Sequence, residues 1–376
     1  MRVAIVTESF LPQVNGVTNT VRQVVEHLGR MGHEALVVAP GPGPAEHDGV
    51  PVVRVRSVGL PGYRSFPIGL PDPAVERAIA GFRPDVVHLA SPIVLGAVGL
   101  RVARKLDIPT VAVYQTDVAG FARHYGLRAD IPTARWVGRI HRRATRTLVP
   151  SRSSYAQLEA MGVPDVHLWR RGVSLDLFDP CRRSEELRAS WSGHRVAGSE
   201  VVVGYVGRLA AEKQVRRLRD LAGLPGVRLV AVGDGPERGW LERNVPGARF
   251  TGMLGGEALA TAFASLDVFV HTGVAETFCQ TVQEAQASGV PVVAPAAGGP
   301  LDLVAHGQTG VLYDPRDPAA LRGAVRDLVG DPGVRGRLAS AALADVAERS
   351  WGSVVGQLVD EHYRQVLHSG SAPAAA

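Results

Sequence analysis

Short runs of consecutive apolar residues alternate with segments of helical periodicity along most of the chain. The runs are rich in valine and other β-branched residues, as strands are, and about 10–20 residues separate most of them. Uninterrupted apolar strands of this kind are typical of parallel sheets that helices cover on both faces. The pattern therefore predicts an α/β protein, with strands at 2–8, 34–40, 84–90, 109–115, 145–151, 200–207, 227–235, 248–253, 266–272 and 290–295.

A polar, glycine-containing stretch at 176–200 interrupts this series and separates two strand sets. We expect two doubly wound Rossmann-like domains that face each other across a cleft, because each strand set can form its own sheet. The last helical pattern has Trp351, Val354, Leu358 and Tyr363 near helical spacing, and we expect this closing helix to pack on the first domain. The expected boundaries are 1–172, 173–350, 351–370 and a disordered tail at 371–376.

The composition describes a globular protein of ordinary apolar content, since 45% of its 376 residues are hydrophobic and 20% are charged. No apolar run reaches the roughly 18 residues of a membrane span, and the N-terminal apolar run is too short for a secretory leader. We therefore expect a cytoplasmic protein. The net charge of +5 is compatible with anionic partners, and the excess of arginine over lysine also fits a GC-rich genome. The two cysteines, Cys181 and Cys279, indicate neither a disulfide framework nor a zinc site.

Candidate chemistry was sought directly after each strand, because parallel sheets bind ligands at the carboxyl ends of their strands. After the first strand, Asn15 can cap a helix, and Gly16 allows backbone amides to approach an anion. An ordinary turn that needs glycine is the alternative. After the strand at 201–206, Arg208 and Lys213 flank the start of the next expected helix and can clamp a diphosphate. A solvated cation pair is the alternative there.

Two glutamates eight residues apart, Glu276 and Glu284, surround the expected start of another helix, which we place from Thr277 to Ser288. The amides at such a helix start favour phosphate. Eight residues rotate Glu284 about 80° from Glu276, so the two carboxylates cannot share one proton site. They can instead hold hydroxyl groups on two sides of a diphosphate, as in a nucleotide-sugar, unless they are unrelated surface residues. Leu254 can line the base site, or pack in the core.

Together these motifs resemble the retaining glycosyltransferases of family 4, which have the GT-B fold. The resemblance spans essentially the whole chain and rests on "PQVNGVTNTV", "GRLAAEK", "GDGPE", "ETFCQTVQEAQASGVPVVAP", "GGPLDLV" and the closing helix. It implies that the first domain binds the acceptor and the second binds the nucleotide-sugar. The implied donor site holds Gly16, Arg208, Lys213, Leu254, Glu276, Thr277, Phe278, Cys279 and Glu284. In it, Arg208 and Lys213 bind the diphosphate, Glu276 the sugar and Glu284 the ribose.

The first domain departs from the family pattern at Gln115, where many relatives have histidine. Glutamine forms hydrogen bonds but does not titrate, so a protonated histidine is not expected there unless His124 moves in. The stretch "YQTDVAGFA" is most similar to actinobacterial GDP-mannose-dependent α-mannosyltransferases. The expected catalytic residues are Glu276, Arg208, Lys213, Asp117 and Gln115, and the expected acceptor residues are Asn15, Tyr63, Arg64 and Asp117.

We expect front-face transfer, in which the leaving diphosphate accepts the proton of the acceptor hydroxyl. The sequence contains no Asp-x-Asp motif, so no metal is expected, and the nucleotide-sugar is a substrate rather than a cofactor. The alternatives are a UDP-sugar donor (GlcNAc or glucose) with a soluble small-molecule acceptor, or a nucleotide-sugar 2-epimerase of the same fold. A two-domain sugar-binding protein is disfavoured because no secretory leader is expected, and no nucleic-acid-binding motif is present.

A stripe of arginines, Arg135, Arg139, Arg142 and Arg146, is predicted to lie along one helix of the first domain, with Trp136 beside it. Such a stripe can rest on an anionic membrane surface and so bring a glycolipid acceptor within reach. It can also be an ordinary solvated face. We therefore expect a cytoplasmic enzyme. If the stripe binds lipid, the enzyme attaches peripherally to the inner face of the membrane.

Overall fold

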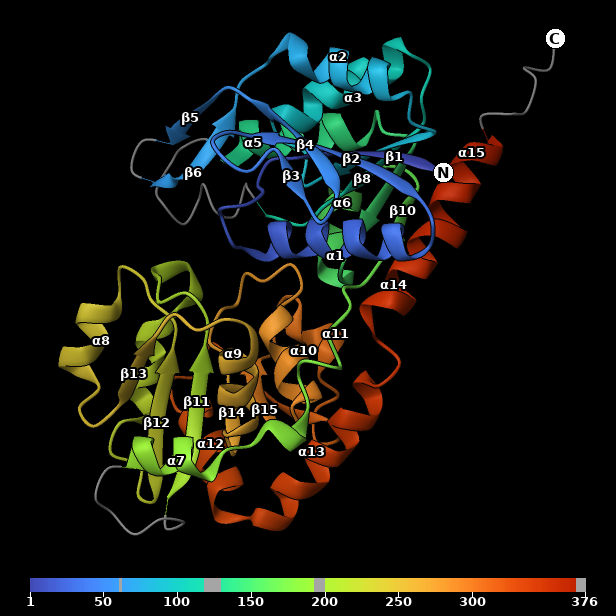
Figure 1. Cartoon of the computed structure of the whole chain (residues 1–376). Helices are drawn as coiled ribbons and strands as arrows, with labels where there is room; N and C mark the ends of the chain where they lie inside the picture. Colours follow the sequence, from blue (N-terminus) through green and yellow to red (C-terminus); the bar gives the residue numbers. More distant parts are fainter. Residues whose placement is uncertain (61–62, 118–129, 193–199, 370–376) are drawn as a thin grey trace. The chain divides into compact units, whose positions relative to one another are not determined.

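The structure is a computed structural model that describes residues 1–60, 63–117, 130–192 and 200–369, except the side chains of 60, 63–66, 130, 192 and 369. The chain forms two compact units (Figure 1). Unit 1 contains Met1–Arg171 and the C-terminal segment from Trp351, and unit 2 contains Gly172–Ser350. Each unit has its own sheet and its own core, which confirms the predicted α/β fold class.

Unit 1 is built on an eight-stranded sheet in the order β10-β9-β8-β7-β1-β2-β4-β3. All neighbouring strands are parallel except β3, which pairs antiparallel with β4. The strands are β1 (Arg2–Thr7), β2 (Glu34–Pro40), β3 (Glu46–His47), β4 (Val50–Val55), β7 (Val86–Ala90), β8 (Thr110–Val113), β9 (Arg146–Val149) and β10 (Val166–Leu168). A separate antiparallel pair is formed by β5 (Ser57–Leu60) and β6 (Tyr63–Gly69).

Helices cover both faces of this sheet, as expected for strands without a polar face. One core joins α1 and the C-terminal helices to β1 and β2, and the other core packs α2 and α3 against the opposite face. The helices are α1 (Gly16–Arg30), α2 (Pro73–Phe82), α3 (Leu95–Lys105), α5 (Asp130–His141), α6 (Arg152–Ala160), α14 (Trp351–Gln357), a π-helical segment (Leu358–Tyr363) and α15 (Arg364–Ser369).

Two buried polar contacts attach the C-terminal segment to unit 1. The indole nitrogen of Trp169 donates a hydrogen bond of 3.0 Å to the carbonyl of Val354. His88 Nδ1 and the hydroxyl of Tyr363 lie 2.7 Å apart, between the sheet and the π-helical segment. These hydrogen bonds join residues that are far apart in the sequence, so the final helices are an integral part of the unit 1 core.

Unit 2 has a six-stranded, fully parallel sheet in the order β13-β12-β11-β14-β15-β16. Its strands are β11 (Val201–Val206), β12 (Val227–Val232), β13 (Arg249–Gly252), β14 (Val268–Val270), β15 (Val292–Pro295) and β16 (Gly310–Tyr313). Its α-helices are α7 (Glu185–Ser192), α8 (Arg238–Asn244), α9 (Gly256–Ala264), α10 (Gln280–Ala287), α11 (Pro300–Leu303), α12 (Ala320–Gly330) and α13 (Pro332–Val346). Three 3₁₀ turns span Pro180–Arg182, Ala211–Lys213 and Val215–Leu221.

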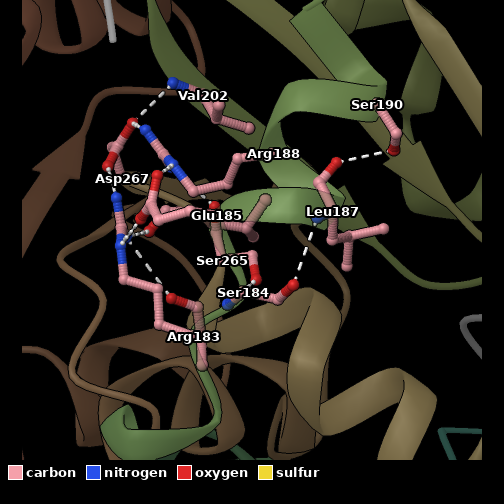
Figure 2. Close-up of polar contacts among 11 residues, drawn as sticks. Arg183, Ser184, Glu185, Leu187, Arg188, Ser190, Val202, Ser265 and Asp267 are labelled. Carbon is pink, nitrogen blue, oxygen red and sulfur yellow. Dashed lines mark hydrogen bonds and ion pairs between the residues drawn. The ribbon is translucent and has the colours of Figure 1, made fainter. Parts of the chain in front are cut away.

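Asp267 organises the amino ends of two strands of unit 2, at the edge of the sheet opposite to the expected ligand edge (Figure 2). Its carboxylate accepts hydrogen bonds from Arg183, Arg188 and the amide of Val202, all between 2.8 and 2.9 Å. Burial alone would raise the pKa of Asp267, but these donors lower it below its usual range. Asp267 therefore fixes the polar segment before β11 to the sheet.

Among the described residues, no helix has the length and apolar character needed to cross a bilayer.

Candidate functional site

The candidate donor residues of unit 2 lie at the carboxyl ends of its strands, where backbone hydrogen bonds hold neighbouring loops together. The amide of Leu209, after β11, donates to the carbonyl of Asp234, after β12, at 2.9 Å. The amide of Gly233 donates to the carbonyl of Gly252 at 2.8 Å. The loops after β11, β12 and β13 therefore form one connected rim. The hydrogen bonds of this rim fix the backbone of the residues that follow these strands.

Arg208 and Lys213 follow β11, as predicted, but the expected α-helix does not begin beside them. The chain instead forms 3₁₀ turns at Ala211–Lys213 and Val215–Leu221, and Gln214 between them has a left-handed backbone (φ 50°). A left-handed residue breaks the helical hydrogen-bond ladder, so no α-helix start supplies amides here. Arg208 Nη1 lies 3.2 Å from Glu212 Oε1, so the guanidinium is held in place by its own turn.

Lys213 and Glu276 form an ion pair with a distance of 2.6 Å between Nζ and Oε1. The Lys213 side chain is 31% exposed and that of Glu276 is 13% exposed. Burial tends to lower the pKa of Lys213, but the Glu276 carboxylate raises it. Conversely, burial tends to raise the pKa of Glu276, while Lys213 and His271 hold it far below its usual range. The structure thus brings together two residues that are 63 positions apart in the sequence.

His271 belongs to the same cluster, although sequence reasoning did not single it out. It follows β14 and is 3% exposed, and its Nε2 lies 3.3 Å from Glu276 Oε1. Burial works to lower the pKa of His271, but the nearby Cys279 sulfur and Glu276 carboxylate raise it above its usual range. Its position directly after a buried strand is the signal in the sequence, because parallel sheets bind ligands at the carboxyl ends of their strands.

The helix around the second glutamate begins later than predicted. Cys279 has a left-handed backbone (φ 81°), and α10 starts only at Gln280. Thr277 and Phe278 therefore lie in the preceding loop rather than in the first turn. The Phe278 side chain is buried in the unit 2 core, and Cys279 is also buried with its sulfur 3.7 Å from Thr281 Oγ1. Of this segment, only backbone groups and Thr277 can approach a ligand, because the other two side chains face the core.

Glu284 lies inside α10 and is half-buried. Within the described part of the chain its carboxylate has no hydrogen-bond or ion-pair partner, in contrast to Glu276. Burial raises the pKa of Glu284 to about 7. The two glutamates therefore have different electrostatic surroundings, since one is neutralised by two cationic groups and the other is not.

The loop after β13 presents Met253, which is 79% exposed, beside Leu254, which is half-buried. Leu254 packs against the unit 2 core, so its predicted role as a wall of the base site is compatible with a packing role. Exposed methionine is unusual because burying a thioether side chain is favourable. This loop therefore offers apolar surface next to the rim of strand ends.

In unit 1, the predicted helix start after β1 is present. Asn15 caps α1, because its Oδ1 accepts hydrogen bonds of 3.0 Å from the amides of Val17 and Thr18. Arg171, which sequence reasoning missed, lies beside this helix start and is 7% exposed. A side chain at Gly16 would place its Cβ 2.8 Å from Arg171 Nη1, so glycine makes room for the guanidinium. Arg171 Nη2 donates a hydrogen bond of 3.3 Å to Gln115 Oε1.

The remaining predicted residues of unit 1 have separate surroundings. The Tyr114 hydroxyl, directly after β8, lies 3.3 Å from Asp117 Oδ1 and 3.2 Å from Gln157 Oε1 and shares its one proton between them, so Asp117 lies close to the end of β8. Tyr63 and Arg64 contribute backbone to β6, but their side chains lie outside the described residues, as does the whole of His124.

Glu8 is a second residue of unit 1 that the sequence did not single out. It follows β1 and is 4% exposed, and its Oε1 accepts hydrogen bonds from the amides of Ile93, Val94 and Gly96 at 2.7 to 2.8 Å. Burial raises the pKa of Glu8, while these amides lower it by a smaller amount. Glu8 thereby fixes the loop that begins α3.

The arginine stripe is shorter than predicted. Arg135, Arg139 and Arg142 are exposed, but α5 ends at His141 and Arg146 starts β9. Arg146 is directed to the C-terminal segment, where its Nη1 lies 2.6 Å from Gln365 Oε1 and 3.3 Å from His362 Nδ1. A strand cannot continue a helical stripe, so Arg146 is a structural residue. The indole nitrogen of Trp136 donates to the carbonyl of Ile93 at 2.7 Å.

Comparison with known proteins identifies the family. Residues 14–177 match Glycosyltransferase Family 4, and residues 200–331 match Glycosyl transferases group 1. The chain is 52% identical to a GDP-mannose-dependent alpha-mannosyltransferase of Mycolicibacterium smegmatis, with both chains fully covered. It is 50% identical to a protein of the same name from Mycobacterium tuberculosis, covering all of this chain and 99% of the relative.

The fold likeness extends to proteins of low sequence identity. Sucrose-phosphate synthase from Thermosynechococcus elongatus superimposes with a TM-score of 0.80 at 22% identity, covering 98% of this chain and 99% of that one. The chain therefore belongs to glycosyltransferase family 4, and its two Rossmann-like units have the GT-B fold.

Proposed function

We propose that the protein is a retaining, metal-independent mannosyltransferase that moves mannose from GDP-mannose to an acceptor hydroxyl. The choice of donor rests on the 47–52% identity to three GDP-mannose-dependent alpha-mannosyltransferases. The observation that supports the site is the ion pair between Lys213 and Glu276, with Arg208 held by Glu212 in the turn that leads to Lys213. It combines cations for a diphosphate with a carboxylate that can accept hydrogen bonds from a sugar.

In the proposed donor complex, Lys213 turns from Glu276 to the diphosphate, and Arg208 binds the same group with its planar fork. A diphosphate carries more negative charge than one carboxylate, so it competes well for both cations. Glu276 then accepts hydrogen bonds from the mannose hydroxyls, and Glu284 accepts them from the ribose. Met253 and Leu254 line the base, and the backbone at Thr277 and Cys279 lies near the phosphates.

We propose that catalysis proceeds on one face of the sugar. The bond between the anomeric carbon and the diphosphate oxygen breaks, and the acceptor oxygen forms its bond to the same carbon from the same side. The acceptor proton passes to the leaving diphosphate oxygen, so no side chain needs to act as a base. Arg208 and Lys213 stabilise the negative charge that develops on that oxygen. Electrostatic stabilisation of this kind is usually the largest single contribution to catalysis.

The acceptor is proposed to bind to unit 1, with Asn15, Gln115, Asp117, Tyr63 and Arg64 around it and Gly16 closing over the phosphates. The exposed Arg135, Arg139 and Arg142 support a glycolipid acceptor at an anionic membrane surface, where each arginine contributes about 1 kcal/mol. This implies a cytoplasmic protein that attaches peripherally to the inner face of the membrane.

A donor panel tests the proposal. The full-length protein is incubated with GDP-mannose, GDP-glucose, UDP-glucose or UDP-GlcNAc, each with and without a lipid extract as acceptor, and both sugar transfer and thermal stabilisation are measured. GDP-mannose should give transfer, and GDP should raise the melting temperature more than UDP. Stabilisation by UDP alone would assign a UDP-sugar donor, and 2-epimerisation without any need for an acceptor would assign the epimerase reaction instead.

A further inference from the structure

His271 is a buried ionisable residue that the proposed transfer reaction does not yet use. Its ring is 3% exposed, and neither ring nitrogen has a hydrogen bond of ordinary geometry within the described part of the chain. An ionisable side chain without such a bond is costly to bury, so its position needs an explanation. The nearest charged group is the Glu276 carboxylate, whose Oε1 lies 3.3 Å from His271 Nε2.

Lys213 and His271 approach the same oxygen of Glu276. The distances to Oε1 are 2.6 Å from Lys213 Nζ and 3.3 Å from His271 Nε2. Among the residues that the structure describes, none donates a hydrogen bond to the second oxygen, Oε2. One oxygen of the carboxylate therefore carries the protein contacts, and the other remains for a ligand.

Gly273 makes this arrangement possible. A Cβ at this position would lie 2.9 Å from Glu276 Oε1, so that the carboxylate would have to shift, and 3.0 Å from His271 Nε2, which is an unusually tight contact. Gly273 itself is absent from the positions with a left-handed backbone, so its role is the space it leaves rather than its conformational freedom. The chain thus keeps the imidazole and the carboxylate next to each other.

We propose that His271 is a positioning residue that holds Oε1 of Glu276 when Lys213 turns to the donor diphosphate, so that Oε2 is presented to the hydroxyl groups of the transferred sugar. This inference rests on the proposed function, because it assigns Glu276 to the sugar. Without a second cation, moving Lys213 would leave Glu276 as a largely buried carboxylate with no partner. An imidazolium at His271 keeps Glu276 ionised through that change, and the raised pKa of His271 agrees with it.

Kinetics of His271→Gln test the proposed role. The variant should lower kcat for transfer by about 10- to 100-fold, the range typical of residues that orient a functional group. Its Kd for GDP should change by less than about twofold, because GDP lacks the sugar that Glu276 binds. His306→Gln, a histidine of unit 2 outside this cluster, is the matched control and should keep wild-type kcat. Equal losses of GDP affinity and kcat in His271→Gln would overturn the proposal.

A double-mutant cycle tests whether His271 acts through Glu276. In a Glu276→Gln background, His271→Gln should lower kcat by less than about twofold, because the effects of substitutions at contacting residues are not additive. If His271→Gln lowers kcat by the same factor with and without Glu276→Gln, the proposal is contradicted. Gly273→Ala provides a second route if His271→Gln does not fold, since the added methyl separates the same two groups. It should also lower kcat without weakening GDP binding, and normal turnover in Gly273→Ala would count against the inference.

Nitrogen NMR gives a readout that does not depend on the donor. The His271 signals, assigned by their loss in His271→Gln, should show an imidazolium at pH 8 in the wild type and a lower pKa of the ring in Glu276→Gln, where the Cys279 sulfur remains beside it. A neutral ring in both proteins would overturn the inference, whatever the enzyme transfers. An imidazolium in a protein that transfers no mannose would instead refute the proposed donor and leave the His271–Glu276 pair intact.

Discussion

Arg171 donates a hydrogen bond through Nη2 to Gln115 Oε1 in unit 1, with 3.3 Å between the two atoms. A guanidinium only donates hydrogen bonds, so this contact sets the orientation of the glutamine amide and places its oxygen toward Arg171. The opposite end of the amide is then Nε2, which is a donor. Glutamine at this place can form hydrogen bonds but cannot perform the proton transfer that a histidine could.

Gly16→Ala should impair the enzyme through Arg171. The new Cβ would press on Arg171 Nη1, which it would approach to 2.8 Å, and so displace the guanidinium from Gln115. We expect kcat/KM to fall about tenfold or more with little loss of thermal stability, because alanine suits the first turn of α1. Gly29→Ala, in the same helix with open space around its Cβ position, is the control. Equal effects of the two substitutions would exclude a specific role for the contact with Arg171.

Arg208→Ala and Lys213→Ala should each lower kcat/KM by at least about a hundredfold, as the loss of one group that stabilises developing charge typically does. Arg216→Ala, an exposed arginine paired with Glu237, should behave like the wild type. Steady-state kinetics on variants of unchanged circular dichroism provide the measurement. Wild-type turnover in either clamp variant would remove that residue from the mechanism.

The two glutamates should show different defects. Glu284→Ala should weaken the binding of GDP-mannose and of GDP alike, because both contain the ribose. Glu276→Ala should reduce turnover but leave GDP affinity nearly unchanged, because it contacts the sugar alone. Calorimetric titration with GDP separates them, and identical losses in both variants would refute the assignment.

The affinity for GDP should depend on the protonation of Glu284. Ribose hydroxyls donate to an ionised carboxylate, and with a pKa of about 7 the ionised fraction rises about tenfold between pH 6 and pH 8. GDP affinity should rise by up to that factor. In Glu284→Gln the part of this pH dependence that comes from Glu284 should be absent. The pH dependence that remains should come from the titration of GDP itself. A pH dependence that is the same in both proteins would show that Glu284 does not contact the nucleotide.

The free energy of unfolding of the protein without nucleotide should fall as the pH rises, whereas the GDP affinity should rise. Burial favours the protonated form of Glu284 and raises its pKa from 4.5, so the folded state binds this proton more tightly than the unfolded state. The resulting stabilisation is fully present below pH 4.5 and is lost as the pH rises through about 7. Denaturant unfolding of the wild type and Glu284→Gln across this range isolates the contribution.

Anionic vesicles should bind the protein at low salt through the exposed arginines of unit 1. Changing Arg135, Arg139 and Arg142 to glutamate should remove about 3 kcal/mol or more of attraction, which is over a hundredfold in partitioning. Changing the exposed Arg316 and Arg326 of unit 2 to glutamate provides a control for charge reversal outside unit 1. Sedimentation with phosphatidylglycerol vesicles measures both, and unchanged binding of the triple variant would favour a soluble acceptor.

Sequence reasoning was most successful where local pattern determines structure. All ten predicted strands are present, because uninterrupted valine-rich runs form buried parallel strands in either unit. It missed β3, β4, β5, β6, β10 and β16, which are very short or carry proline, glycine, charged or other polar residues. It also expected one α-helix to start between Arg208 and Lys213 and another at Thr277, because it could not foresee the left-handed backbones of Gln214 and Cys279.

The candidate site was predictable in part for the same reason. Arg208, Lys213 and Glu276 lie in segments that follow strands, and Glu284 lies in the helix that comes next, so their motifs are visible locally. Arg171 acquires its importance from Gly16 and Gln115, which are distant in the sequence. His271 contacts Glu276, which is close in the sequence, but Glu276 in turn pairs with the distant Lys213. Such contacts depend on tertiary packing, and a single sequence does not display them.

The connection between the two units gives unit 2 a simple topology. Its chain runs without interruption from Gly172 to Ser350, whereas unit 1 resumes only at Trp351. Val173 and Ser350 form a parallel bridge, and the amide of Val173 donates to the carbonyl of Arg349 at 2.9 Å. The first and last residues of unit 2 are therefore neighbours, as in an inserted domain. Unit 2 can consequently be exchanged between relatives as one cassette, with both junctions at a single point.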